Sequence, residues 1–221
     1  MKKRGLSNIF LSASIPFRER YRKYYDTADF TSIRDAVRAL ATTVIPGTHL
    51  IWGGHPAITP LIRYVMEKMN SNLKEHVTVY QSAFFEKDFP ADNFFFEDIV
   101  VVPRESTIEM SLESMRKSMI LGNRFDAGVF IGGMEGIELE YKMFTDAHPN
   151  ALILPIASTG AGAKILYDKI AANSPSEIEH RLLTDYAYKA LFRDLLGDLI
   201  KPFDAEDLND TDNGNENIRD L

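Results

Sequence analysis

The sequence predicts an α/β protein with a three-layer α/β/α, Rossmann-like fold around a mostly parallel sheet. Apolar runs of strand length alternate along the chain with longer segments of helical periodicity. The apolar runs do not alternate with polar residues, which is typical of strands that helices cover on both faces. Neither an internal repeat nor a linker interrupts this pattern before residue 203. We therefore expect residues 1–203 to form one domain.

The predicted strands are short apolar runs, most of which end in small or polar residues. In chain order they are residues 8–14 (NIFLSAS), 49–54 (HLIWGG), 76–85 (HVTVYQSAFF), 98–103 (DIVVVP), 127–133 (AGVFIGG) and 151–158 (ALILPIAS). Their length and lack of alternation place them in the buried sheet.

The predicted helices occupy the segments between these strands. In residues 31–45 the side chains of Ile33, Val37 and Leu40 fall on one face. The helix of residues 106–120 begins with a serine and a threonine, which can cap its N-terminus. The remaining predicted helices are residues 58–69, 134–144 and 161–170, and residues 174–200 close the pattern as one helix or a helix pair.

Composition excludes several classes of protein. Of the 221 residues, 45% are hydrophobic and 26% are charged, as in soluble globular proteins. No apolar run approaches the roughly 20 residues that span a bilayer, so we expect no membrane segment. The absence of cysteine excludes disulfides and thiol catalysis, and a cytoplasmic location is the default. The five histidines lack metal-binding spacing, so we expect neither a metal nor a cofactor.

The negative charge is concentrated at the end of the chain. The net charge is −7, and residues 204–221 contain seven acids and one base, which leaves about −1 for the rest. This segment has the composition of a disordered tail. A nearly neutral body with an acidic tail disfavours nucleic-acid binding.

Small and polar residues follow four of the predicted strands. In such folds ligands bind beyond the carboxyl ends of the strands. The four sets are Ser12 and Ser14; Gly53, Gly54 and His55; Gly132, Gly133, Glu135 and Gly136; and Ser158, Thr159 and Gly160. We expect them to converge on one crevice that holds a phosphate-bearing ligand. His55 either donates to the phosphate or only shapes its turn.

Charged residues flank the third of these loops. Arg116 and Lys117 lie on the preceding helix, and Glu138 and Glu140 on the following one. An arginine fork suits phosphate, while a carboxylate holds ribose hydroxyls or activates water. The alternative is that Arg116 only forms a helix-surface ion pair with Glu109 or Glu113. The sequence also leaves open whether Glu138, Glu140 or neither faces the crevice.

Together these residues resemble the signature of the Lonely Guy (LOG) and lysine-decarboxylase-like proteins of the SLOG superfamily, an Arg-Lys helix followed by PGGxGTxxE. The superfamily also includes DprA and ligand-sensing domains of antiviral systems. The resemblance extends over most of residues 6–170, including FLSASIP and IWGGHPAITPLI. It implies that Gly132, Gly133 and Gly136 bind phosphate, that Arg116 holds the ligand or assists catalysis, and that Glu140 is the catalytic acid if the protein is an enzyme.

The sequence departs from the LOG motif at three points. Ile131 replaces the proline, Ile137 replaces the threonine, and one extra residue separates the double glycine from the final glutamate. One residue turns a helical side chain by about 100°. The GGxxGxxxE form and the STGAG loop resemble more closely the SLOG domains of bacterial nucleotide-signalling and antiviral systems, which are similar to sensors of NAD-derived or cyclic nucleotides.

The leading hypothesis is a nucleotide-binding SLOG domain that senses a phosphoribosyl-containing signal as a homodimer or higher homo-oligomer. The alternative is a LOG-like hydrolase that cleaves the N-glycosidic bond of nucleoside 5′-monophosphates, with Arg116 and Glu140 as catalytic residues. Binding of single-stranded DNA, as in the DprA branch, is disfavoured by the charge.

Two further segments have alternative interpretations. The basic and aromatic residues of 17–30 either form a lid over the crevice or a packed helix, and the packed helix is favoured. The phenylalanines between residues 84 and 96 are expected to form core and a subunit contact rather than a platform for a base.

Overall fold

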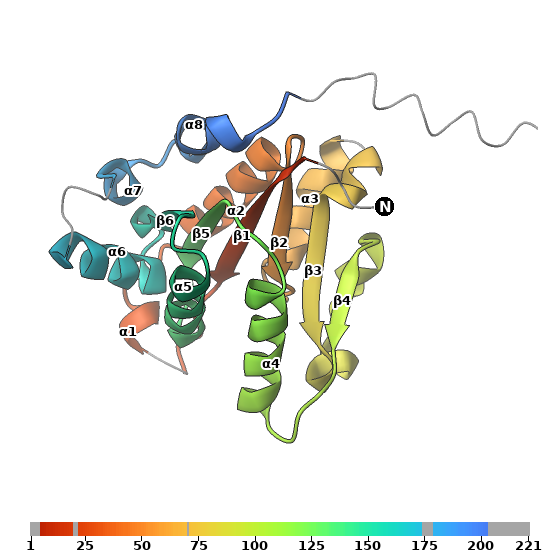
Figure 1. Ribbon diagram of the computed structural model, residues 1–221. Coiled ribbons are helices and arrows are strands. Elements are labelled where there is room, and N and C mark those ends of the chain that lie inside the picture. The colour runs from red at the N-terminus through yellow and green to blue at the C-terminus, as the bar shows by residue number, and fades with distance from the viewer. Residues whose placement is uncertain (1–4, 20–21, 70, 174–178, 203–221) are drawn as a thin grey trace, which may run out of the picture.

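The computed structural model describes residues 5–19, 22–69, 71–173 and 179–202. These residues form a six-stranded sheet with helices on both faces (Figure 1). The strands are β1 (Ser7–Ser14), β2 (Thr48–Gly53), β3 (Val77–Ser82), β4 (Ile99–Val102), β5 (Ala127–Gly132) and β6 (Leu152–Ile156). The predicted acidic tail, residues 204–221, lies outside the described residues.

The strand order is β4-β3-β2-β1-β5-β6, and every neighbouring pair is parallel. The chain builds β1 to β4 outward in one direction and then returns to place β5 on the other side of β1. The strand order therefore reverses between β1 and β5, where Ser14 is in register with Gly132. The predicted α/β fold with a mostly parallel sheet is confirmed, and this reversal is the point at which such sheets bind ligands.

Helices cover both faces because successive strand side chains point to opposite sides. Ile9 and Leu11 of β1 pack on the face that carries α2 (Phe30–Val44), α3 (Thr59–Met69) and α8 (Tyr188–Leu196). Phe10 packs on the opposite face, under α4 (Ile108–Leu121) and α5 (Glu135–Ala147), where its ring stacks 5.2 Å from that of Phe144. α6 (Ala161–Asn173) lies beside β6 and contacts both β5 and β6 (Figure 1).

The N-termini of α2 and α4 are each capped by a side-chain oxygen. The Asp29 carboxylate accepts a hydrogen bond from the Ser32 N–H at 2.9 Å and starts α2. The Thr107 hydroxyl accepts from the Met110 N–H at 3.2 Å and starts α4. A capping side chain satisfies an N–H group that the helix itself leaves unpaired.

Some predicted boundaries are wrong. β3 ends at Ser82 instead of residue 85, because the Ser82 hydroxyl accepts from the Phe84 N–H at 3.3 Å and begins the 3₁₀ helix η2 (Ala83–Asp88). β6 likewise ends at Ile156 and continues as η4 (Ala157–Thr159). The other 3₁₀ helices are η1 (Ser71–His76), η3 (Ala91–Phe95) and η5 (Gly197–Leu199).

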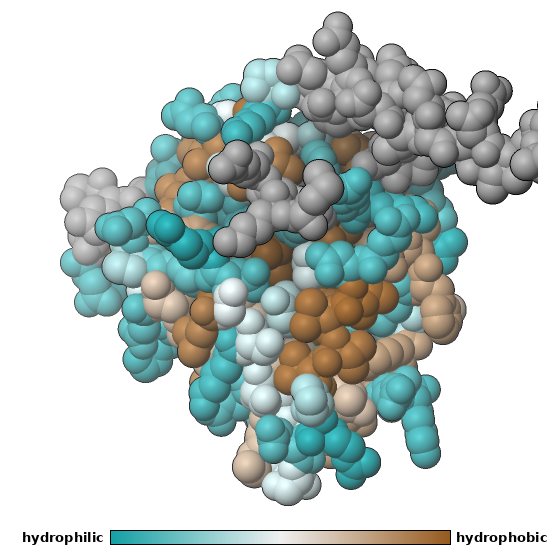
Figure 2. Space-filling view, turned by 45° about the vertical axis from the view of Figure 1, so that its right-hand side comes forward, coloured by the Kyte–Doolittle hydropathy of each residue, from teal (hydrophilic) through white to brown (hydrophobic). Residues whose placement is uncertain are grey.

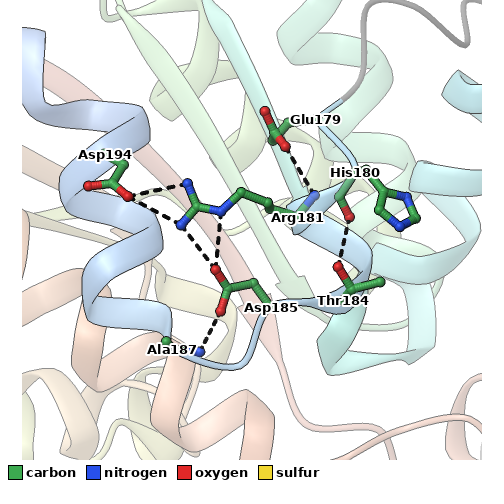
Figure 3. Close-up of polar contacts among 7 residues, drawn as sticks. All are labelled: Glu179, His180, Arg181, Thr184, Asp185, Ala187 and Asp194. Carbon is green, nitrogen blue, oxygen red and sulfur yellow. Dashed lines mark hydrogen bonds and ion pairs between the residues drawn. The ribbon is translucent and has the colours of Figure 1, made fainter.

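The closing segment is a helix pair, α7 (Arg181–Thr184) and α8, with residues 174–178 outside the described part. The Arg181 guanidinium joins the two helices by ion pairs of 3.0 Å to Asp185 and 3.2 Å to Asp194 (Figure 3). The Asp185 carboxylate also accepts from the Ala187 N–H at 2.8 Å. The turn between α7 and α8 that these contacts hold places α8 against α2, and Leu191 of α8 is buried.

Segment 17–30 contains α1 (Arg22–Tyr25), and its residues 20 and 21 lie outside the described part. Tyr24 is buried against Met134 and Ala161, so the favoured interpretation as a packed helix describes this part of the segment. Among the phenylalanines between residues 84 and 96, Phe96 is in the core and Phe95 packs against it, as expected, while the expected subunit contact stays a prediction.

Some hydrophobic side chains stay accessible on the surface. Figure 2 shows a face on which strongly hydrophobic side chains gather in one area among hydrophilic ones. β4 is an edge strand of the sequence IVVV, and Val101 is exposed on it. An open apolar edge strand is a surface on which chains can associate. Among the described residues, no helix is long and apolar enough to cross a membrane.

Candidate functional site

A cleft of about 950 Å³ opens at the carboxyl ends of β1, β2 and β3 and continues between α4 and α5. η2 and the turn after β2 form its other wall. Nine of the predicted site residues line it: Ser12, Ser14, Gly53, Gly54, His55, Arg116, Glu135, Gly136 and Glu140. The sequence therefore predicted nine of the residues that line the cleft, and their role in binding a ligand stays a prediction.

The centre of the cleft is a hydrogen-bonded group of Arg116, Glu140 and Ser12. The Arg116 Nε donates to Glu140 Oε1 at 3.0 Å, and the Ser12 hydroxyl donates to Glu140 Oε2 at 2.5 Å. The side chains of Arg116 and Glu140 are only 14% and 16% exposed. The alternative of a surface ion pair with Glu109 or Glu113 is therefore wrong for Arg116, whose partner lies across the cleft on α5.

The Arg116 guanidinium keeps two donor nitrogens for a ligand. Within the described residues, Nη1 and Nη2 make no hydrogen bond, because the pair with Glu140 uses Nε alone. Nη2 lies against Gly136, where an added Cβ would be 3.0 Å away. Gly136 therefore leaves the space that the guanidinium occupies.

The same guanidinium lies over the first turn of α5. Met134 occupies the N-cap position of this helix and provides no side-chain hydrogen bond to the first-turn N–H groups. A helix N-terminus carries partial positive charge and binds anions. An arginine fork beside a helix N-terminus without a side-chain cap is an arrangement that can bind an anion, although Glu135 and Glu138 in the same first turn oppose it electrostatically.

Gly132 and Gly133 turn the chain between β5 and α5. Their φ angles of +57° and +83° lie in the left-handed region that favours glycine. The Gly133 N–H donates to the Ser14 carbonyl at 2.9 Å, and the Gly133 carbonyl accepts from Gly162. Neither glycine lines the cleft. They place the N-terminus of α5 at the cleft without themselves forming its surface.

The fourth predicted loop does not reach the cleft. The Ser158 hydroxyl is hydrogen-bonded to the Tyr188 hydroxyl at 3.1 Å. The Thr159 hydroxyl accepts from the Gly132 N–H at 2.9 Å. Gly160 is buried against the backbone of Thr27. The expectation that four loops share one crevice is wrong for Ser158, Thr159 and Gly160, which instead support the β5 turn from behind.

Lys117 also lies outside the cleft. It forms a surface ion pair with Glu113 at 2.6 Å, and both side chains are more than half exposed. The hydrogen bond from Lys117 lowers the pKa of Glu113 below its usual value. The helix-surface ion pair with Glu113 that the sequence allowed for Arg116 is formed instead by the neighbouring residue, Lys117.

The structure decides between the two glutamates of α5. Glu138 accepts from the Tyr24 hydroxyl and lies 3.6 Å from Lys23, while Glu140 faces the cleft. Two residues separate helical side chains by about 200°, and Glu138 accordingly points toward α1 and is absent from the cleft lining. The extra residue of the motif falls between Gly133 and Gly136, where α5 begins. Glu140 therefore keeps its helical relation to Gly136.

His55 is held in one neutral form at the far end of the cleft. Its Nδ1 accepts from the Ala57 N–H at 3.1 Å, so the ring carries its proton on Nε2. Burial disfavours the imidazolium and lowers the pKa of His55 from 6.5 to about 4. His55 therefore both shapes its turn and provides a donor, Nε2–H, at the cleft.

We expect His55 to make the protein sensitive to acid. The unfolded chain binds the imidazole proton near pH 6.5 and the folded chain only near pH 4, so the free energy of unfolding falls as the pH drops through this window. The loss amounts to about 3 kcal/mol at most. Urea unfolding of the protein and of His55→Asn at pH 7 and pH 4.5 measures it. The difference in free energy of unfolding between the protein and His55→Asn should be smaller at pH 4.5 than at pH 7. An equal difference at both pH values would contradict a neutral His55 in the folded protein. His180→Asn, at an exposed histidine, is the control.

Sequence reasoning did not identify Gln81 and two aromatic residues of the cleft. Gln81 is 5% exposed at the end of β3, and its amide Nε2 donates to the Gly54 carbonyl at 3.0 Å. Phe85 and Phe89 line the same end. A glutamine at the carboxyl end of an apolar strand was the available signal. Within the described part of the chain, no group of three or more histidine or acidic residues is placed to hold a metal ion.

Comparison with known proteins gives a family and matching solved structures. The crystal structure of TM1055, a structural genomics target, has 13% sequence identity over 74% of this chain and 81% of that chain, with a TM-score of 0.49. No curated protein matches the chain. The family model of the SLOG cluster3 family matches residues 23–196, which is most of the chain. The protein therefore belongs to the SLOG cluster3 family, and this membership indicates a nucleotide-related Rossmann-like domain.

Proposed function

We propose that the protein binds a phosphoribosyl-containing nucleotide in this cleft and acts as a sensor of that nucleotide. The single observation that carries the proposal is the Arg116 guanidinium, which Glu140 orients through Nε while both terminal nitrogens remain available beside the N-terminus of α5. Two parallel N–H donors match two oxygens of a phosphate. Membership of the SLOG cluster3 family supports a nucleotide as the ligand.

Glu140 and Ser12 suit the sugar of such a ligand. Each Glu140 oxygen accepts one hydrogen bond, from Arg116 or from Ser12, and a carboxylate oxygen has room for a second. A ribose hydroxyl is a donor of the right kind, and it would approach beside the phosphate site. The carboxylate repels a phosphate itself, so it helps to orient the ligand with its sugar toward α5.

The charge of the cleft favours a ligand with few phosphates. Among the described residues that line it, six are acidic, Asp88, Glu109, Glu113, Glu135, Glu140 and Asp146, and two are basic, Arg116 and Lys142. Lys142 is engaged by Asp146 at 2.9 Å. A triphosphate would place its additional charges against these carboxylates, which costs free energy. We therefore propose a monophosphate or a compact cyclic nucleotide in preference to a triphosphate.

A second candidate function is hydrolysis of the N-glycosidic bond of a nucleoside 5′-monophosphate. The observation that favours it is the Glu140 carboxylate, which is fixed inside the cleft next to a guanidinium. A carboxylate in such a place can stabilise an oxocarbenium-like transition state. Both Glu140 oxygens are already hydrogen-bonded, however, and this supports a holding role over activation of water.

One experiment tests binding and separates the two functions. The protein is incubated with nucleoside monophosphates, ATP, NAD and cyclic ADP-ribose isomers, and thermal stabilisation and release of free base are followed. The sensor proposal expects stabilisation by a monophosphate or cyclic nucleotide, less stabilisation by ATP, and no base release. Base release that disappears in Glu140→Gln would establish the hydrolase instead. Absence of stabilisation by every nucleotide would contradict both functions.

The wider role is also part of the proposal. We propose a cytoplasmic signalling component of an antiviral system that acts as a homodimer or higher homo-oligomer. The signalling and antiviral role rests on the resemblance of the glycine motifs to SLOG sensor domains. The open edge of β4 with exposed Val101 supports self-association, which sedimentation velocity of the full chain would test.

A further inference from the structure

We infer that the β2–β3 end of the cleft selects a nucleobase that carries an exocyclic amino group next to a ring-nitrogen acceptor, as adenine and cytosine do. This inference rests on the proposed function and specifies its ligand. It assigns the selection to Gln81 and His55, which read the base edge with one acceptor and one donor.

Gln81 supplies the acceptor. The Gly54 carbonyl can only accept a hydrogen bond, so the amide nitrogen of Gln81 must face it, as the 3.0 Å distance shows. The amide oxygen consequently points away from Gly54. Within the described residues this oxygen accepts no hydrogen bond, although the side chain is 95% buried and lines the cleft. The oxygen therefore remains available to accept a hydrogen bond from a donor group of a ligand in the cleft.

His55 supplies the donor beside it. Gly54, whose carbonyl holds Gln81, directly precedes His55 in the chain, and both side chains line the same cleft. The Ala57 N–H occupies Nδ1, which fixes the proton on Nε2. No described residue accepts a hydrogen bond from Nε2. Gln81 and His55 thus present one hydrogen-bond acceptor, the Gln81 amide oxygen, and one donor, His55 Nε2–H.

This pattern distinguishes the common bases. The amino group of adenine or cytosine donates to the Gln81 oxygen, and the neighbouring ring nitrogen accepts from His55 Nε2–H. Hypoxanthine and uracil present a carbonyl and an N–H in those two places, so oxygen faces oxygen and N–H faces N–H. Phe85 and Phe89 add an apolar wall against which a base can pack.

The distance from the anion site also fits a nucleotide. Ser12, which bonds Glu140, lies at the end of β1, and Gln81 lies at the end of β3. These strands are two positions apart in the sheet, which corresponds to about 10 Å. A ribose fits between a phosphate at Arg116 and a base at Gln81.

Calorimetric titration of the full chain with AMP, IMP, CMP and UMP tests the inference. We expect AMP to bind at least about tenfold more tightly than IMP, and CMP more tightly than UMP, because each mismatch leaves buried polar groups unpaired. Gln81→Met, of similar volume, should reduce the AMP-to-IMP ratio to near one. Glu86→Gln, at an exposed residue of η2 outside the cleft lining, should leave the ratio unchanged.

The outcomes separate the two claims. Equal binding of AMP and IMP by the unaltered protein would overturn the base selection and leave the proposed function standing. A preference for AMP that persists in Gln81→Met would overturn the assignment to Gln81. Binding of none of the four would overturn the base selection, and the proposed function would then fall only if NAD and the cyclic ADP-ribose isomers also fail to stabilise the protein. If Gln81→Met does not fold, the unaltered protein is titrated with purine riboside monophosphate, which lacks the amino group and must bind more weakly than AMP if the inference is correct.

Discussion

Arg116→Ala is expected to weaken binding of AMP by about 100-fold or more. The substitution removes both terminal nitrogens that would hold the phosphate, and a lost charge-assisted pair in a desolvated site costs about 2–5 kcal/mol. Arg116→Lys should recover little of this, because an ammonium group lacks the planar fork and the Nε–H that Glu140 accepts. Isothermal titration calorimetry measures the change in Kd.

The neighbouring residue provides the matched control. Lys117→Ala removes a positive charge one position away, but Lys117 is exposed and pairs only with Glu113, so binding should change little. Equal weakening by both substitutions would mean that general charge attracts the ligand. Arg116→Ala leaves Glu140, whose side chain is only 16% exposed, without its ion-pair partner, which destabilises the fold. The double variant Arg116→Ala/Glu140→Gln removes this charge and should still fail to bind.

Gly160→Ala is expected to destabilise the protein by about 3–5 kcal/mol, because strain and steric overlap add. Gly160 has φ +70° and ψ −154°, a region that essentially only glycine occupies. An added Cβ would lie 1.8 Å from the Thr27 carbonyl oxygen, which is backbone and cannot rotate away. This loop also accepts the Asp29 N–H at the start of α2. The loss is large compared with the 5–15 kcal/mol by which domains are usually stable.

Urea unfolding measures this effect, and a second glycine is its control. Gly197 follows α8 with φ −54°, and an added Cβ there meets no atom within 4 Å. Gly197→Ala should therefore be neutral or slightly stabilising, since alanine restricts the unfolded chain. A loss below about 1 kcal/mol for Gly160→Ala would show that the loop can rearrange, and would contradict its role as a fixed support of the β5 turn.

The sequence predicted the fold well because its signals are local. Six apolar runs without alternation, separated by amphipathic segments such as 31–45, require a buried parallel sheet. Position along each strand then placed Ser12 and Gly53 near one edge, and Arg116 was expected on the helix that precedes β5. The ends of elements were less certain, as the capping of η2 by Ser82 illustrates. A capping serine and a continuing strand look alike in sequence.

The parts of the site that sequence reasoning missed depend on long-range packing. Nothing local shows that Tyr188 of α8 and Thr27 would cover the loop of Ser158 to Gly160. The choice of Glu140 over Glu138 required the residue at which α5 begins, and periodicity places a helix end only to within a few residues. Sequence reasoning did not identify Gln81, because its place in the cleft depends on a hydrogen bond to the Gly54 carbonyl, 27 positions earlier in the chain.

The central claim is that the cleft holds a nucleotide with its phosphate on Arg116. A crystal structure of the protein with bound AMP tests it most directly. The account predicts phosphate oxygens within hydrogen-bond distance of Arg116 Nη1 and Nη2 and beside the first turn of α5, with the ribose near Glu140. A nucleotide bound outside this cleft, or bound with its phosphate away from Arg116, would contradict the account.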